Sequence, residues 1–155
     1  MMKLPVSLQN GVELVWQKCC AIESCDDRRF SFIDIGIIRC QGKYGLIHIP
    51  NEDELDDSIP LLTCTFDALH LLYHPLNKSY FVGFKEGKCG LYAMTAHSYQ
   101  HAEDYYFVDC TELAKPEHDS ISWNGDSIIT LHQGDYRQDY CLRTHTLSTP
   151  YENSW

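Results

Sequence analysis

Two histidine pairs have a spacing that could serve metal chemistry. His70 and His74 in "HLLYH", and His97 and His101 in "HSYQH", are each four residues apart. On a helix this spacing would place both imidazoles on one face, where zinc could bind them. A zinc site needs three or four ligands, and the metalloprotease motif needs a glutamate directly after the first histidine, where this chain has leucine or serine. We therefore predict surface or partly buried histidines, with no metal and no cofactor.

The eight cysteines offer a second route to chemistry. Cys19 and Cys20 are adjacent and Cys25 is nearby, but the chain has no Cys-x-x-Cys pair of the kind found in zinc knuckles and redox sites. The N-terminal segment lacks the continuous apolar run of a signal peptide, so we expect a cytoplasmic protein with buried, reduced thiols.

Sequence motifs of the common enzyme classes are missing as well. The chain contains no phosphate-binding loop, no Gly-x-Ser-x-Gly nucleophile elbow and no dinucleotide fingerprint. We predict that the protein is not an enzyme. A metal- or thiol-dependent enzyme built from the histidines and cysteines is an alternative that the sequence leaves open.

Carboxylates form the most concentrated charge feature. The segment "NEDELDDS" (51–58) places five acids around Leu55, either as a solvated loop that keeps a β edge from pairing or as a docking surface for a cationic protein. The segment "HAEDYYFVD" (101–109) interleaves acids with tyrosines, although strand alternation would turn about half of its aromatics into the core. The predicted partner-binding residues are Glu52, Asp53, Glu54, Asp56, Asp57, Glu103, Asp104, Tyr105 and Tyr106.

The charge balance restricts the kind of partner. Twelve Lys and Arg stand against twenty-two Asp and Glu, which leaves a formal net charge of −10 at pH 7. Eleven acids and six bases lie before residue 78 and the same numbers lie after it, so the charge is spread through the chain. Because this charge repels nucleic-acid phosphates and anionic lipids, we predict no nucleic-acid and no membrane partner.

These groups must be positioned by β-hairpins. The stretch "GKYGL" at 42–46 returns as "GKCGL" at 87–91, and each copy follows a β-prone run and a turn, Gln41-Gly42 or Glu86-Gly87. A third hairpin is predicted at Asn124-Gly125, a favoured pair for a tight turn. A fourth is predicted between "SIITLH" and "YCLRTHTL", with "QGDYRQD" as its loop. Successive hairpins indicate a mostly antiparallel β protein.

Helical signals are weak. Residues 11–24 fit a helix or a strand, and Pro60 limits residues 51–72 to a short turn or helix at most. We predict one mostly β domain over 1–155, in which antiparallel hairpins or a meander form a sandwich, partial barrel or repeat-like stack with few short helices. Repeat-like units are expected near 37–72 and 82–113. Since one such unit cannot bury its apolar face alone, neighbouring units must stack.

The first unit resembles a WG repeat, also called a KWG repeat, a bacterial β-rich unit. In that family a Gly-Lys-aromatic-Gly core is followed by an apolar strand, an Ile-Pro pair and an aromatic-Asp pair. Residues 42–46 match the core, Ile59-Pro60 the second signal and Phe66-Asp67 the third. Tyr44 stands where tryptophan is usual, and the second unit has Cys89 there and lacks Ile-Pro. The resemblance implies a binding scaffold and supplies no catalytic residues.

A small acidic β protein with such a repeat resembles a bacterial immunity protein. We predict a non-enzymatic protein that binds and neutralises a cationic toxin domain, for instance a basic nuclease. An enzyme that holds polyanions must carry positive charge, which is the physical reason for expecting a nuclease target. A WG-type interaction or structural module without a toxin partner is the alternative among binding proteins.

Overall fold

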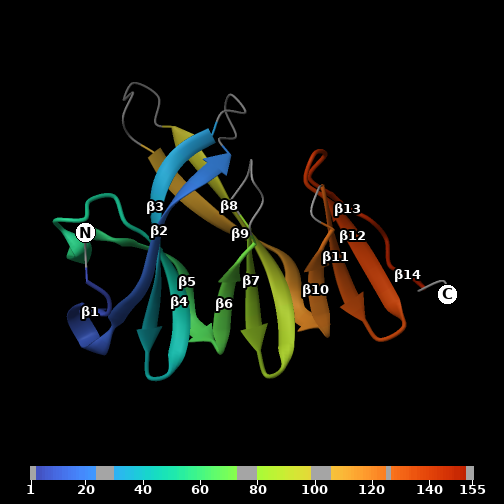
Figure 1. The fold of residues 1–155 in the computed structure, drawn as a ribbon, viewed down its shortest axis with the longest axis horizontal. Coiled ribbons are helices and arrows are strands. Elements are labelled where there is room, and N and C mark those ends of the chain that lie inside the picture. The colour runs from blue at the N-terminus through green and yellow to red at the C-terminus, as the bar shows by residue number, and fades with distance from the viewer. Residues whose placement is uncertain (1–2, 24–29, 73–79, 99–105, 125–126, 153–155) are drawn as a thin grey trace.

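The described part of the chain forms a row of three antiparallel sheets. The computed structural model describes residues 3–23, 30–72, 80–98, 106–124 and 127–152. Over these residues the fold is mostly β, and its two helices are single 3-10 turns, η1 (Gln9–Gly11) and η2 (Leu55–Asp57). The predicted fold class, antiparallel β with few short helices, is confirmed. The sheets follow one another from β1 at one end of the row to β14 at the other (Figure 1).

Each sheet is a meander of strands that are close in sequence. The first sheet contains β1 to β5 in order: Val6–Ser7, Glu13–Glu23, Phe30–Cys40, Lys43–His48 and Ile59–Phe66. The second contains β6 to β9 in order: Ala68–Leu71, Tyr80–Lys85, Lys88–Ser98 and Tyr106–His118. The third contains β10 to β13 in order, with β14 also paired to β12: Ser120–Trp123, Ile128–Gln133, Tyr136–Cys141, Thr146–Leu147 and Tyr151–Glu152. Residues 11–24, which fit a helix or a strand by pattern, contain the whole of β2.

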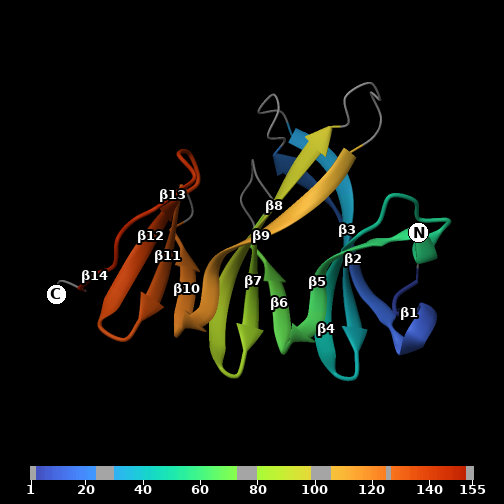
Figure 2. The same ribbon diagram turned by 180° about the vertical axis from the view of Figure 1, so that it is seen from behind.

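Two-residue turns close the central hairpins of the first two sheets. Gln41-Gly42 joins β3 to β4 with φ of 53° and 78°, and Glu86-Gly87 joins β7 to β8 with φ of 51° and 78°. Positive φ at both turn positions is the signature of a type I′ turn, whose twist matches that of the flanking strands. Both predicted turns are confirmed. They lie on the same side of the row as the turn between β11 and β12 (Figures 1 and 2).

The hairpin predicted at Asn124-Gly125 forms with a different connection. Trp123 pairs with Ile129, so β10 and β11 are not joined by a two-residue turn, and Gly125 lies outside the described residues. The Asn124 N–H donates to the Ile128 carbonyl at 3.0 Å, and the Asn124 side chain accepts the Ile128 N–H at 3.1 Å. Such a side-chain bond offers the backbone an alternative to the tight turn, so the predicted turn type is wrong.

The loop predicted at 133–139 is also wrong. Gln133 pairs with Tyr136, so the turn between β11 and β12 is Gly134-Asp135 alone, and the rest of the segment is strand. Gly134 has a φ of 59°, which glycine adopts without steric cost. All three sheets therefore have a two-residue turn in their central hairpin.

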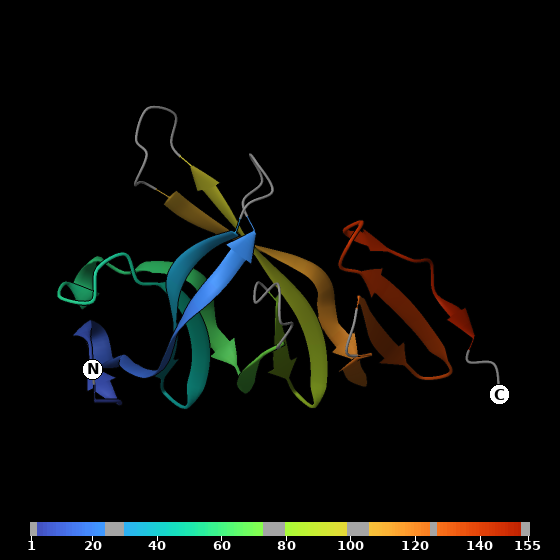
Figure 3. The ribbon, with the colours of Figure 1, turned by 45° about the horizontal axis from the view of Figure 1, so that its top comes forward.

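Neighbouring sheets bury their apolar faces against each other. The core between the first and second sheets includes Ile22 and Ile35 from the first and Phe81 and Met94 from the second, all at most 2% exposed. A second core joins the second sheet to the third and consists of Tyr80, Leu91, Ala114, Ile129, Leu131 and Tyr140. The far ends of β2–β3 and of β8–β9 extend away from the hairpin turns (Figure 3). Stacking of successive sheets is thus what removes apolar surface from water.

The second glycine of each repeated stretch makes room for the last strand of its sheet. A Cβ on Gly45 would lie 2.6 Å from the carbonyl oxygen of Leu62 in β5, and a Cβ on Gly90 would lie 2.6 Å from that of Ala114 in β9. The pairing register shifts at this point in both sheets. Two hairpins forty-five residues apart in sequence therefore use the same device to admit a third strand.

The first sheet is bonded to the second through Asp67, the single residue between β5 and β6. One carboxylate oxygen of Asp67 pairs with the ammonium of Lys43, which starts β4 in the same unit. The other oxygen accepts the N–H of Glu86 at 2.8 Å, in the turn of the next hairpin. The Lys43 ammonium and the Glu86 N–H together lower the pKa of Asp67.

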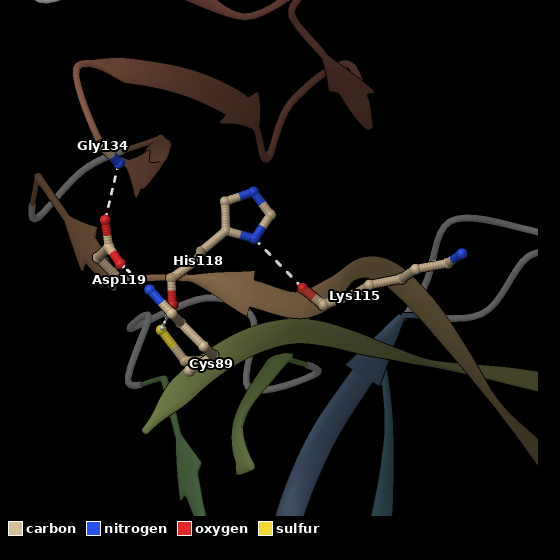
Figure 4. A network of polar contacts seen from close by, with 6 residues as sticks. Cys89, Lys115, His118, Asp119 and Gly134 are labelled. Carbon is tan, nitrogen blue, oxygen red and sulfur yellow. Dashed lines mark hydrogen bonds and ion pairs between the residues drawn. The ribbon is translucent and has the colours of Figure 1, made fainter. Parts of the chain in front are cut away.

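Asp119, the single residue between β9 and β10, repeats this arrangement one sheet further on (Figure 4). It pairs with Lys88, which starts β8, and accepts the N–H of Gly134 at 2.7 Å, in the turn of the third hairpin. The Gly134 N–H and then Lys88 lower the pKa of Asp119. We call this arrangement of lysine, aspartate and next-turn amide the sheet clasp. The two clasps hold three hairpin turns in line.

The second glycine can be tested by adding one methyl group. We expect Gly90→Ala to destabilise the fold by about 3 kcal/mol, the upper end for overpacking, because a backbone carbonyl cannot rotate away as a side chain can. Gly87→Ala is the matched control, since its Cβ would meet no atom within 4 Å and only its φ of 78° is strained. That strain is worth about 1 kcal/mol. Urea denaturation measures both, and equal losses would contradict the proposed role of Gly90.

The clasps also predict a pH dependence. Because the folded pKa of Asp67 and of Asp119 is lowered from 3.8, their stabilisation is present above that value and is lost as the pH falls through the folded pKa. The urea midpoint of the double variant Asp67→Asn, Asp119→Asn should therefore fall less than that of the wild type between about pH 5 and about pH 3. Glu117→Gln, at an exposed site outside the clasps, should follow the wild type. Parallel curves for all three proteins would show that the clasps contribute nothing.

Candidate protein-binding surface

The five acids of 52–57 lie on a short loop that packs against the first sheet through Leu55. Leu55 packs against an apolar cluster on the outer face of the first sheet, formed by Leu14, Ile47 and Ile49 with Val6, Leu8 and Ile38 at its edge. Leu55 begins η2, and it is the only apolar residue among the acids. Contact of this partly buried side chain with the cluster holds the loop against the sheet and leaves the carboxylates outside.

Local hydrogen bonds give the loop a defined shape. Asn51 accepts the N–H of Asp53 with its side chain at 2.9 Å and that of Glu54 with its carbonyl at 3.1 Å. The N–H of Asp57 donates to the Glu54 carbonyl at 3.0 Å, closing the single turn of η2. Glu52, Asp53, Glu54, Asp56 and Asp57 are all exposed, and they border a shallow hollow of about 410 Å³ together with Ser7, Leu8 and Leu55.

The carboxylates of this loop repel one another. A hydrogen bond and charge repulsion from Asp57 raise the pKa of Glu54, and burial together with the charge of Glu52 raises the pKa of Asp34 on β3. Glu52 accepts a hydrogen bond from the neutral amide of Gln17 at 2.8 Å. Among the described residues, the ion pairs are made by other acids. The loop therefore holds a concentrated negative charge that a cation would stabilise.

The second predicted acidic segment cannot be placed with the first. Glu103, Asp104 and Tyr105 lie outside the described residues. Tyr106 is the first residue of β9, and the position of its side chain is not described. The structure thus assigns a geometry only to the segment 52–57. It adds Gln17, which is hydrogen bonded to Glu52, and Asp34, on which the charge of Glu52 acts. The sequence does not reveal either residue because both are far from the loop along the chain.

The first histidine of each predicted pair lies in a strand, so the four-residue spacing does not place the pair on one helix face. His70 lies in β6 and His97 in β8, while His74 and His101 lie outside the described residues. The Nε2 atom of His97 lies 2.9 Å from a carboxylate oxygen of Asp109. Within the part of the chain that is described, no group of three or more His, Cys, Asp and Glu side chains is arranged to hold a metal.

No disulfide joins any two of the seven described cysteines, and they are not uniformly buried. Cys20 and Cys89 are buried, whereas Cys19 is exposed, so the expectation of buried thiols holds only for some. Cys141 differs in its chemistry, because hydrogen bonds from Thr144 and from the N–H of Arg143 lower the pKa of its thiol.

One polar cluster has the order of groups found in activated nucleophiles. His145 Nε2 lies 3.2 Å from a carboxylate oxygen of Glu23, and its Nδ1 lies 3.4 Å from the hydroxyls of Tyr80 and Tyr140. The two hydroxyls are 3.3 Å apart. Both phenols are 3% exposed, and burial raises the pKa of each, so neither is an accessible nucleophile. Since its members come from β2, β7, β12 and the turn after β12, the cluster ties the three sheets together.

Comparison with known proteins returned no match to a family model, to a curated protein or to a solved structure. None of the described helices has the length and apolar character needed to cross a membrane. The anchored acidic loop is therefore the feature of the described surface that carries the functional interpretation.

The structural role of the polar cluster can be tested with Tyr80→Phe. Removing this buried hydroxyl leaves Tyr140 and His145 with one partner fewer, which should lower the free energy of unfolding by about 1 kcal/mol. Tyr136→Phe is the matched control, because Tyr136 is 50% exposed and its loss should leave stability unchanged. Urea denaturation measures both variants. A Tyr80→Phe protein as stable as the wild type would remove the cluster from the contacts that hold the sheets together.

Proposed function

We propose that this chain is a non-enzymatic protein-binding protein, an immunity protein that neutralises a basic toxin domain by binding it. The observation that carries the proposal is the acidic loop, whose carboxylates are exposed, repel one another and are fixed in place by Leu55. A toxin that acts on nucleic acid must present Lys and Arg to phosphates. Carboxylates that pair with those residues would occupy the substrate's place.

The anchoring of the loop favours binding on physical grounds. A loop already held in one conformation loses little conformational entropy when a partner docks, so less of the interaction energy is spent on ordering it. Its uncompensated charge increases the rate at which a cationic protein arrives, and that gain falls as salt screens the field. These two properties suit an inhibitor that must reach its target before the target reaches its substrate.

A second candidate is an interaction or structural module of the WG-repeat type with no toxin partner. The observation in its favour is the pair of sheet clasps, which repeat the same lysine, aspartate and turn amide in successive sheets. A scaffold of this kind would bind through its row of sheets rather than through one charged loop. The two candidates therefore differ in how strongly binding depends on residues 52–57.

The proposal predicts that charge on the loop controls association. The test variant replaces four acids of the loop by their amides: Glu52, Asp53, Asp56 and Asp57. Stopped-flow fluorescence then measures its binding to the basic domain encoded by the open reading frame adjacent to this gene. The association rate constant should fall about tenfold at low ionic strength, and the wild-type rate should approach that of the variant at high salt.

The control variant changes the same total charge elsewhere. It replaces four exposed acids that are distant in sequence from the loop: Glu86, Glu117, Asp135 and Glu152. This replacement should reduce the association rate constant far less. An adjacent gene whose product is not basic, or does not bind, would contradict the immunity function. Equal effects of the two quadruple variants would remove the loop from the interface and favour the scaffold.

A further inference from the structure

Phe32 is an apolar side chain in an unusual position. It lies near one end of the β2–β3 ladder, opposite Ala21 and two pairs before the terminal pair of Glu23 and Phe30, and 77% of it is exposed. Its sequence neighbour Ile33 is 6% exposed and faces the core between the first and second sheets. Because side chains alternate along a strand, Phe32 points away from that core. At this position the side chain buries little apolar area in the fold.

The exposed face that carries Phe32 leads directly to the acidic loop. Asp34 follows Phe32 on the same face, and Gly36 pairs with Gln17, whose amide is hydrogen bonded to Glu52. From Phe32 to Gly36 the strand rises by about 13 Å. The charge of Glu52 also acts on Asp34, which places the loop beside this face. An exposed aromatic ring is thus continuous with a set of carboxylates.

We propose that Phe32 is the apolar anchor of the same interface. This inference rests on the proposed function and adds the residue that determines which basic protein is bound. Phe32 would enter an apolar pocket of the cationic partner, while Asp34 and the acidic loop pair with Lys and Arg at the pocket rim. A buried aromatic centre with a charged rim is the usual anatomy of a specific interface. The occupant is therefore a basic protein with an apolar depression inside its positive surface.

A second copy of this chain is a poorer occupant of the same surface. A symmetric dimer through Phe32 would bring two sets of repelling carboxylates together, and each copy carries a net charge of −10. A basic partner would instead offset the charges of Asp57 and Glu52, which add to a hydrogen bond in raising the pKa of Glu54 and to burial in raising the pKa of Asp34. Charge complementarity thus selects a heterologous partner.

The two parts of the surface have separable kinetic roles. Long-range attraction by the carboxylates acts before contact and governs the association rate, as for other charged interfaces. Contact with Phe32 forms only in the docked complex, so it governs the dissociation rate. Charge alone would attract any polycation, and the aromatic ring is what distinguishes one basic surface from another.

Two fluorescent peptides of equal positive charge separate these roles, oligolysine and a peptide in which lysine alternates with leucine. Fluorescence anisotropy measures their dissociation constants for the wild type, for Phe32→Ser and for the neutralised loop variant. The wild type should bind the lysine–leucine peptide about tenfold more tightly than oligolysine, and Phe32→Ser should abolish that preference. Tyr136→Ser, at another exposed aromatic site, should retain it.

The outcomes distinguish this inference from the proposed function. If Phe32→Ser keeps the preference while neutralising the loop weakens both peptides, the anchor is overturned and the cationic partner stands. If neutralising the loop weakens binding no more than the control quadruple variant does, the proposed site fails whatever Phe32 does. Sedimentation of the wild type provides a further check, because a dimer that Phe32→Ser dissociates would assign the surface to a second copy and overturn the proposal.

Discussion

The structure depends on one repeated interaction, an aspartate carboxylate shared between two successive hairpins. Asp67 and Asp119 each bond a lysine of their own unit and a turn amide of the next, so charge and backbone geometry are satisfied by the same group. A hydrogen bond to an ionised acceptor is stronger than one between neutral groups. Apolar stacking supplies most of the driving force, but stacking is non-directional. The clasps are directional, because each connects one sheet to a particular turn amide of the next sheet.

This constraint has a consequence at the end of the row. Apolar cores join the first sheet to the second and the second to the third, whereas the apolar cluster on the outer face of the first sheet is packed by Val6, Leu8 and Leu55. A solenoid-like row needs a polar outer cover at its ends. The acidic loop meets this need with one partly buried leucine and five exposed acids. The same feature that completes the fold therefore presents the charge assigned to partner binding.

The sequence predicts those parts of the structure that local chemistry decides. Gln41-Gly42 and Glu86-Gly87 are read correctly because positive φ is set by two residues, and the acids of 52–57 are exposed as their charge requires. The second clasp escapes sequence reading because thirty-one residues separate Lys88 from Asp119, against twenty-four between Lys43 and Asp67. Because the two spacings differ, a fixed repeat length does not align His118-Asp119 with Phe66-Asp67. The alternation Ile33, Ile35, Ile37 already turns Phe32 and Asp34 outward, so that signal was present in the sequence.

Amide hydrogen exchange at the hairpin turns tests the clasp most directly. Glu86 and Gly134 occupy the first turn position of the second and third hairpins, and each donates to a clasp aspartate. Gln41 has the same position in the first hairpin, and among the described bonds none joins its N–H to a carboxylate. We predict that the amides of Glu86 and Gly134 exchange at least about tenfold more slowly than that of Gln41 after correction for sequence effects. Equal exchange at the three turns would contradict it.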